Sequence, residues 1–224
     1  MREEPTGDGR PTNRRAERRR RRLERWCGGL LAAYRKDPAL HGVAAAEVVL
    51  YPGVWAIGAH RVSHRLWQLG VPFVPRLISQ VVRSLTGVEI HPGAKIGRCV
   101  FIDHGAGVVI GETAEVGDHV MMYHGVTLGG HGWWVDRKGS KRHPTIGEGV
   151  TLGVGASVLG PVTVGANSRI GPHAVVIDDV PPDSVVVAPK GRHLVERGER
   201  VRTGYEEATL VQPAWLQDHE MGGL

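Results

Sequence analysis

The sequence has few of the residues that build disulfide scaffolds, metal centres and membrane spans. Its 224 residues include only two cysteines, Cys27 and Cys99, and no metal-binding or redox spacing links them. Aromatic residues make up 5% of the chain. No apolar run reaches the roughly 18 residues that a membrane helix needs, and residues 1–25 lack the apolar segment of a signal peptide. We therefore expect a cytoplasmic protein with two free thiols and no membrane segment.

An excess of charge of one sign is also missing from most of the chain. The whole sequence has 28 basic and 23 acidic residues, a formal net charge of +5. Residues 1–25 hold ten arginines and five acidic residues, so this arm accounts for the whole excess. Its arginines would bind nucleic acid or an anionic surface electrostatically, but no aromatic residues interleave with them. We expect 1–25 to be a disordered, dispensable extension.

Apolar residues between 26 and 86 follow helical spacing, which predicts a small helical domain there. Four helices are expected, over 26–34, 37–50, 54–69 and 73–85. Asp37-Pro38 supplies an N-cap followed by proline at the first helical position. Residues 51–53 (YPG) are expected to break the chain between the second and third helices.

From Ile90 to Val176 every sixth residue is aliphatic or alanine, with one interruption. The series is Ile90, Ile96, Ile102, Val108, Ala114, Val120, Val126, and then Ile146, Leu152, Val158, Val164, Ile170, Val176. Neither a helix nor a half-exposed strand has this period. A six-residue repeat is typical of a parallel β-helix, in which each hexapeptide supplies one strand and one corner. An irregular β-sandwich would not keep this phase.

Three hexapeptides make one coil, so residues 18 apart are expected to stack, for example Ile90 over Val108. The β-helix is predicted over 87–187 and a tail over 188–224. The phase breaks by 20 residues between the two parts of the series, so 130–142 is expected to leave the prism as a loop. Trp133-Trp134 in this loop would cover a ligand or pack on a neighbouring subunit.

Several motifs stand in register along the chain. They are 35–39 (RKDPA), 51–53 (YPG), 64–67 (HRLW), 89–97 (EIHPGAKIG), 102–105 (IDHG), 111–113 (GET), 125–130 (GVTLGG) and 141–147 (KRHPTIG). Together they resemble the serine O-acetyltransferase family over about residues 34–187. The resemblance implies a mostly β protein, a left-handed parallel β-helix of hexapeptide repeats behind a small N-terminal α-helical domain.

The same resemblance implies the reaction. An enzyme of this family transfers acetyl from acetyl-CoA to the hydroxyl of L-serine, which gives O-acetyl-L-serine for cysteine biosynthesis. Histidine is the usual base for such a hydroxyl because its pKa lies near working pH, and His104 in Asp103-His104 is the candidate. Glu89 occupies the position of the family's carboxylate partner. No serine or cysteine stands in a nucleophile setting, so we expect direct attack, without a metal or an acyl-enzyme.

The other site residues follow from the same motifs. By resemblance, Arg142 and His143 hold the serine carboxylate, and a guanidinium suits this task. Asp37 and Asp103 would face the ammonium group, with Glu112 near the pocket. Backbone amides at Gly129-Gly130 are the expected oxyanion donors. The pantetheine arm is expected to approach Gly153, Gly155 and Gly171.

The family also implies partners. We expect a homotrimer or a dimer of trimers, and the shortened helical domain leaves this choice open. L-Cysteine is an expected feedback inhibitor. The tail ends at Leu224, where relatives commonly end in isoleucine, so binding of the O-acetylserine sulfhydrylase through the tail is a further hypothesis.

Three other functions are alternatives to this one. The first is O-acetyl transfer to a sugar, homoserine or an antibiotic. The second is a γ-class carbonic anhydrase, since His119 and His124 have a suitable spacing, but Arg83 stands where a third histidine is needed. The third is a scaffold without activity, against which Glu89 and His104 argue.

Overall fold

The computed structural model describes residues 50–132, 140–190, 195–196 and 199–200. Asp37, the first predicted helix, nearly all of the second and the pair Trp133-Trp134 lie outside these residues. So do the whole of the arginine-rich arm and most of the tail.

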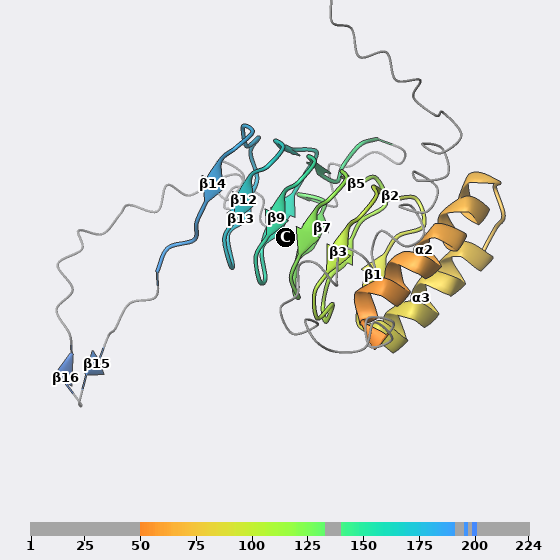
Figure 1. Cartoon of the computed structure of the whole chain (residues 1–224), viewed down its shortest axis with the longest axis horizontal. Helices are drawn as coiled ribbons and strands as arrows, with labels where there is room; N and C mark the ends of the chain where they lie inside the picture. Colours follow the sequence, from red (N-terminus) through yellow and green to blue (C-terminus); the bar gives the residue numbers. More distant parts are fainter. Residues whose placement is uncertain (1–49, 133–139, 191–194, 197–198, 201–224) are drawn as a thin grey trace, which may run out of the picture. The chain divides into compact units, whose positions relative to one another are not determined.

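Short parallel strands form a three-sided β-helix between Glu89 and Val186 (Figure 1). Face A contains β1 (Glu89–Ile90), β4 (Val109–Ile110), β7 (Thr127–Gly129), β10 (Ser157–Leu159) and β13 (Val175–Val176). Face B contains β2 (Lys95–Ile96), β5 (Glu115–Val116), β8 (Thr145–Ile146) and β11 (Thr163–Val164). Face C contains β3 (Phe101–Ile102), β6 (Met121–Met122), β9 (Thr151–Leu152), β12 (Arg169–Ile170) and β14 (Val185–Val186). The predicted parallel β-helix is confirmed.

Each hexapeptide points two side chains into the prism. The larger one is the second residue of a strand, such as Ile110 or Leu152, and the smaller one lies two residues earlier, such as Val108 or Val150. All four are at most 1% exposed. Because inner residues stack on their equivalents in the next coil, one continuous apolar core runs along the prism.

The stacking predicted for Ile90 and Val108 is wrong. Ile90 pairs with Ile110, which is 20 residues away, because the first coil has two residues more than the regular 18. The added residues lie in the corner Asp103–Gly107, where His104, Gly105 and Gly107 have positive φ. The sequence concealed this insertion, since both inner positions of a hexapeptide are apolar and a shift of two residues keeps the pattern.

A second insertion separates β7 from β8. Glu115 pairs with Thr145, 30 residues away, so twelve residues more than a regular coil lie between these strands. This register agrees with the loop predicted over 130–142, of which 133–139 lie outside the described residues. Regular 18-residue coils resume from Thr145, which pairs with Thr163.

Two helices, α2 (Pro52–Gln68) and α3 (Val74–Thr86), pack against each other at the β1 end of the prism (Figure 1). Their bounds lie within two residues of the prediction. Of residues 51–53, where the sequence predicts a break between two helices, only Tyr51 lies outside α2. Pro52 and Gly53 form the first turn of α2, where proline has no hydrogen bond to lose. A Cβ on Gly53 would come 2.2 Å from the carbonyl oxygen of Ile102, so this glycine lets the helix approach the prism.

Two further strands lie outside the prism. β15 (Val195–Glu196) and β16 (Glu199–Arg200) pair antiparallel in a separate unit, Pro189–Leu224. Within the ranges that the structure describes, no helix is long and apolar enough to cross a membrane.

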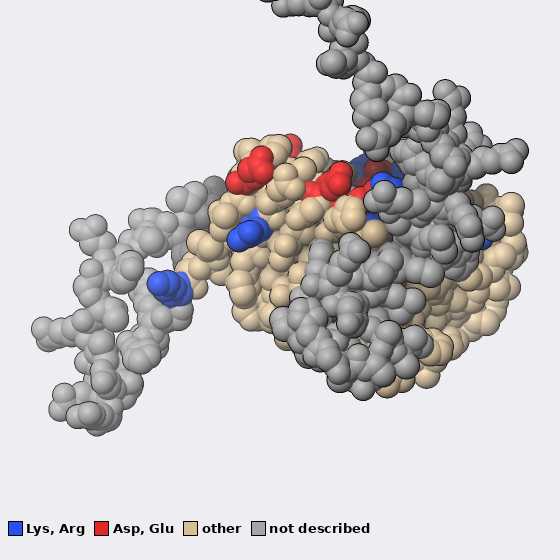
Figure 2. Space-filling view, in the orientation of Figure 1, with Lys and Arg blue, Asp and Glu red and all other residues tan. Residues whose placement is uncertain are grey.

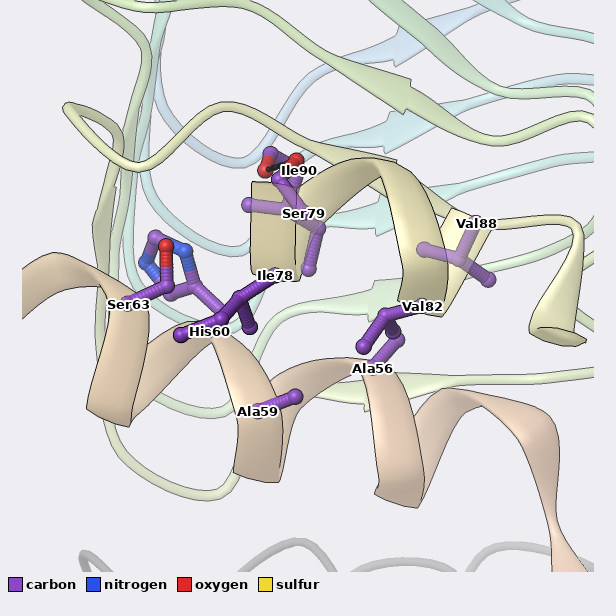
Figure 3. Close-up of a pocket in the computed structure, with 9 residues that line it drawn as sticks. All are labelled: Ala56, Ala59, His60, Ser63, Ile78, Ser79, Val82, Val88 and Ile90. Atoms are coloured by element: carbon purple, nitrogen blue, oxygen red, sulfur yellow. Dashed lines mark hydrogen bonds between the residues drawn. The ribbon is translucent and has the colours of Figure 1, made fainter. Parts of the chain in front are cut away.

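A buried histidine lies between the two helices and β1 (Figure 3). His60 is 5% exposed, and it lines a cavity of about 10 Å³ together with Ser63 and Ser79. The two serine hydroxyls donate to the carbonyls of Pro75 and Ile90, at 2.9 and 2.7 Å. Nδ1 of His60 has no hydrogen-bond partner among the described residues. Burial, with repulsion from the neighbouring His64, lowers the pKa of His60 to about 3.

We expect the fold to lose stability as the pH falls below about 6.5, the pKa of His60 in the unfolded chain. The folded pKa is lower, so unfolding takes up a proton, and stability present above pH 6.5 is lost toward pH 3. The His60→Gln variant lacks this proton uptake. The free energy of urea unfolding of wild type, relative to that of the variant, should therefore fall by about 1.4 kcal/mol per pH unit in this window. An unchanged difference would contradict the assignment.

Candidate active site

The first group of predicted site residues lies at the corner that precedes β4. The two added residues make this corner bulge, and the side chain of His104 is 73% exposed there. Gly105 lies beneath the bulge, where a Cβ would come 2.8 Å from a methyl group of Val88. The corner therefore holds an imidazole clear of the prism, accessible to a substrate.

Asp103 is the buried member of this corner. Its side chain is 13% exposed, and Oδ2 lies 3.8 Å from Nε2 of His104. Oδ1 is buried and has no hydrogen-bond partner among the described residues. Buried polar atoms are nearly always paired in folded proteins. The unpartnered oxygen is therefore a candidate acceptor for a donor from outside the described residues.

The carboxylate expected beside His104 has another partner. Glu89 lies on β1, at the start of the coil that His104 ends, and one of its oxygens is 3.3 Å from Nη1 of Arg83 on α3. No hydrogen bond or ion pair joins Glu89 to His104 in the described part of the chain. The ring of His104 instead meets the edge of His124 in the next coil, with 6.1 Å between the ring centroids.

The second group lies at the corner that follows β4. Nη2 of Arg142 donates to Oε2 of Glu112 at 2.5 Å, and both side chains are half-buried. His143 lies against the backbone of Gly111, where a Cβ would come 2.0 Å from the ring. Its Nδ1 accepts a hydrogen bond from the backbone N–H of Thr113 at 3.1 Å. The structure thus brings Glu112, Arg142 and His143 together.

A further histidine belongs to this corner and was not among the predicted site residues. Nδ1 of His91 accepts a hydrogen bond from the backbone N–H of Gly93 at 3.0 Å. Burial lowers the pKa of His91 to about 4, and Arg76 adds repulsion. The ring is therefore neutral at neutral pH, with its proton on Nε2. The motif 89–97 contained this residue, but only the packing reveals its tautomer.

The two corners stand on opposite edges of face A. From Gly107, the last residue of the first corner, to Glu112 the chain runs five residues along β4. At about 3.3 Å per residue this is roughly 16 Å. One prism therefore does not bring His104 and Arg142 to the same small substrate.

The predicted coenzyme A positions have structural reasons to be glycine. A Cβ on Gly153 would lie 2.8 Å from the backbone N of Pro172, and one on Gly171 would lie 3.0 Å from the carbonyl oxygen of Val186. Gly155 lies under the ring of His173. At the start of the loop, Gly129 is half-buried and Gly130 is exposed. Contact between coils alone therefore accounts for Gly153 and Gly171.

Charges at these corners act as local pairs. On the face in Figure 2, acidic and basic side chains both lie along the β-helix, and most of the described surface is uncharged. No three His, Cys, Asp or Glu side chains within the described ranges lie close enough together to hold a metal ion. The carbonic anhydrase interpretation of His119 and His124 therefore finds no support here.

Comparison with known proteins gives a consistent set of relatives. The family model "Bacterial transferase hexapeptide (six repeats)" matches residues 143–178. The serine acetyltransferase of Mycobacterium tuberculosis is 55% identical over 166 residues, which cover 74% of this chain and 70% of the relative. That of Bacillus subtilis is 50% identical over 179 residues, 80% of each protein.

Solved structures of the same kind superpose on this chain. Serine acetyltransferase from Neisseria gonorrhoeae in complex with serine is 38% identical, with a TM-score of 0.67, and the match covers 75% of this chain and 67% of that one. The enzyme from Brucella abortus in complex with coenzyme A is 35% identical, with a TM-score of 0.70. This match covers 79% of this chain and 68% of that one. Serine acetyltransferase isoform 3 from Entamoeba histolytica in complex with cysteine is 37% identical, with a TM-score of 0.69. This match covers 78% of this chain and 60% of that one.

We expect Gly153→Ala to lower the free energy of unfolding by roughly 1–3 kcal/mol even without coenzyme A, because the new methyl group would meet backbone in the next coil. Gly58→Ala in α2 is the matched control. A Cβ there meets nothing within 4 Å, and alanine favours a helix by about 1 kcal/mol over glycine. Urea unfolding measures both. Unchanged stability of Gly153→Ala, together with weaker coenzyme A binding, would assign this glycine to the ligand instead.

Proposed function

The chain belongs to the serine acetyltransferase family, and on this premise we propose that it transfers the acetyl group of acetyl-CoA to the hydroxyl of L-serine. The product is O-acetyl-L-serine, the precursor for cysteine biosynthesis. Relatives of this name are about half identical to the chain, and solved relatives hold serine or coenzyme A.

The unpartnered oxygen of Asp103 is the observation that favours an amino acid as the acceptor of the acetyl group. A buried carboxylate without a donor fits an ammonium group, which an amino acid supplies and a sugar lacks. Arg142 and His143 supply the complementary site for the substrate carboxylate, and Glu112 fixes the guanidinium from one side. Asp37, the second expected partner of the ammonium group, lies outside the described residues.

His104 acts as the general base in this proposal. It takes the proton from the serine hydroxyl while the oxygen attacks the thioester carbonyl. The tetrahedral intermediate then collapses, the bond from carbon to sulfur breaks, and the imidazolium returns the proton to the leaving thiolate. Backbone N–H groups of Gly129 and Gly130 would stabilise the oxyanion. The pantetheine arm would pass the coils at Gly153, Gly155 and Gly171.

Glu89 is proposed as the carboxylate that orients the protonated ring of His104. It would have to turn away from Arg83, whose side chain is 55% exposed. Exposed ion pairs of this kind contribute only about 0–1 kcal/mol to stability, so little free energy is lost when Glu89 leaves Arg83. Long catalytic hydrogen bonds are common in enzymes without bound substrate.

A complete site requires a second copy of the chain. His104 and Arg142 lie on opposite edges of face A, so a substrate held by both must lie between the His104 corner of one prism and the Arg142 corner of another. Such a head-to-tail contact closes into a ring. We propose a homotrimer, alone or as a dimer of trimers, with one site at each interface.

An inhibitor and a partner protein are also part of this proposal. The cysteine bound to the Entamoeba enzyme makes L-cysteine a candidate inhibitor that competes with serine. The tail ending at Leu224 is the proposed segment for binding the O-acetylserine sulfhydrylase. A cytoplasmic location fits both roles.

We expect serine-dependent release of coenzyme A from acetyl-CoA, and a loss of about 10²–10⁴-fold in kcat for His104→Ala. Thiol release measures both, with homoserine and a sugar as alternative acceptors. Release with one of the other acceptors alone would keep the base but change the substrate. The absence of release with every acceptor would favour a scaffold without activity.

Co-expression of His104→Ala with Arg142→Ala should restore activity that neither variant has alone. Each interface needs His104 from one chain and Arg142 from its neighbour. In a randomly mixed ring about a quarter of the sites have both, so the preparation should reach about a quarter of wild-type activity. Activity no higher than that of the single variants would place the whole site within one chain.

A further inference from the structure

Three consecutive residues just before Pro144 and β8, at 141–143, make hydrogen bonds to one threonine. Lys141 donates through Nζ to the carbonyl oxygen of Thr113 at 2.9 Å. The backbone N–H groups of Arg142 and His143 both donate to Oγ1 of Thr113, each at 3.0 Å. Strand hydrogen bonds begin at Pro144, whose carbonyl accepts from Glu115, and at Thr145, which donates to Val162. Thr113 therefore holds the chain in place before the strand does.

The hydroxyl of Thr113 uses its full bonding capacity. A hydroxyl has one proton to donate and two lone pairs. Both lone pairs are taken by Arg142 and His143, and the proton points to Nδ1 of His143, 3.0 Å away. Nδ1 also receives the backbone N–H of Thr113 at 3.1 Å. A nitrogen that accepts from two donors carries no proton, so the neutral ring of His143 has its proton on Nε2.

The same ring also packs closely on Gly111, near Cδ2 and Nε2. A Cβ there would come 2.0 Å from Cδ2 and 2.2 Å from Nε2 of His143. The Thr113 hydroxyl thus holds the ring at Nδ1, and Gly111, which has no side chain, leaves room for the ring near Cδ2 and Nε2. Both its position and its tautomer are set by residues that are not themselves expected to touch the substrate.

We propose that Thr113 is a positioning residue for recognition of the substrate carboxylate, which rests on the function proposed above. Its hydroxyl fixes the backbone of Arg142 and presents His143 as a neutral donor through Nε2–H. Gly111 completes the arrangement by leaving room for the ring. Loss of the hydroxyl removes the acceptor for two backbone N–H groups at once, so the pair that receives the carboxylate loses its alignment.

The test compares Thr113→Val, which keeps the shape, with Thr113→Ser, which keeps the hydroxyl. We expect Thr113→Val to raise the KM for serine roughly 10–100-fold, with the KM for acetyl-CoA within about twofold of wild type. Thr113→Ser should restore most of the affinity for serine. Thr163→Val on β11, an exposed threonine of face B, is the matched control and should change neither constant.

A second readout does not depend on activity. Nitrogen-15 NMR of the imidazoles, with the His143 signal assigned through His143→Gln, should show the Nε2–H tautomer in wild type and Thr113→Ser. In Thr113→Val the signal should move toward a mixture of tautomers. Gly111→Ala should displace the ring and raise the KM for serine although Thr113 is intact. If Thr113→Val does not fold, Thr113→Ala replaces it in both measurements.

Equal serine KM values and an unchanged His143 signal in the variant without the hydroxyl would overturn the proposal. Equal losses in Thr113→Val and Thr113→Ser would show that the site is disturbed whether or not the hydroxyl is kept, and would overturn it as well. A wild-type enzyme without serine activity would refute the proposed function alone, because the NMR comparison still decides whether Thr113 sets the tautomer.

Discussion

The hydrogen bonds between successive coils constrain everything else in this molecule. Each strand of the prism is two or three residues long, and all but the end strands of each face are bonded to the coils on both sides. The second residue of a strand points inward. An insertion within a strand would turn inner residues outward and break the ladder. Additional residues are therefore tolerated only at corners. The chain uses two corners in this way, with two added residues around His104 and twelve between β7 and β8. Both insertions flank face A, and all of the predicted catalytic and carboxylate-binding residues that the structure describes belong to strand ends or corners of this face.

The same constraint explains how charge is handled. Apart from Ser168, the inner positions are apolar, so charged groups occur at the rim, and several of them have a local partner. Arg142 is paired with Glu112, and Glu89 with Arg83. Asp103 differs from these pairs, because its Oδ1 is buried and unpartnered among the described residues. An ion pair at the rim is already satisfied and contributes little specificity by itself, whereas an unpartnered buried carboxylate favours a ligand that brings a cation. The substrate class is therefore better inferred from Asp103 than from the more numerous paired charges.

The fold could be predicted from the sequence because a six-residue period has few structural explanations, and the parallel β-helix is confirmed. The phase could not be followed past Ile102, because Val108 and Ile110 are both apolar and both point inward. The sequence favours a helix break at Gly53, whereas in the structure this glycine lies in the first turn of α2 and lets the helix approach Ile102. His104, Asp103 and Arg142 were selected by their motifs, and their roles stay predictions. Thr113 and His60 could not be selected in this way, since a saturated hydroxyl and a buried imidazole are properties of the packing and leave no pattern in the sequence.

The shape of the prism supports the proposal that the site lies between two chains. A three-sided coil is convex, and strands of two residues leave no room for a pocket within a face. Its corners project side chains outward, so one prism offers His104 and Arg142 on separate ridges about one face apart. A small amino acid can meet both only if a second ridge closes on the first. Binding then removes the substrate from water on all sides, which a single convex body does not achieve, and the electrostatic interactions at the transferred acetyl group become stronger. A β-helix that transfers an acetyl group between two small molecules is thus expected to do so as an oligomer.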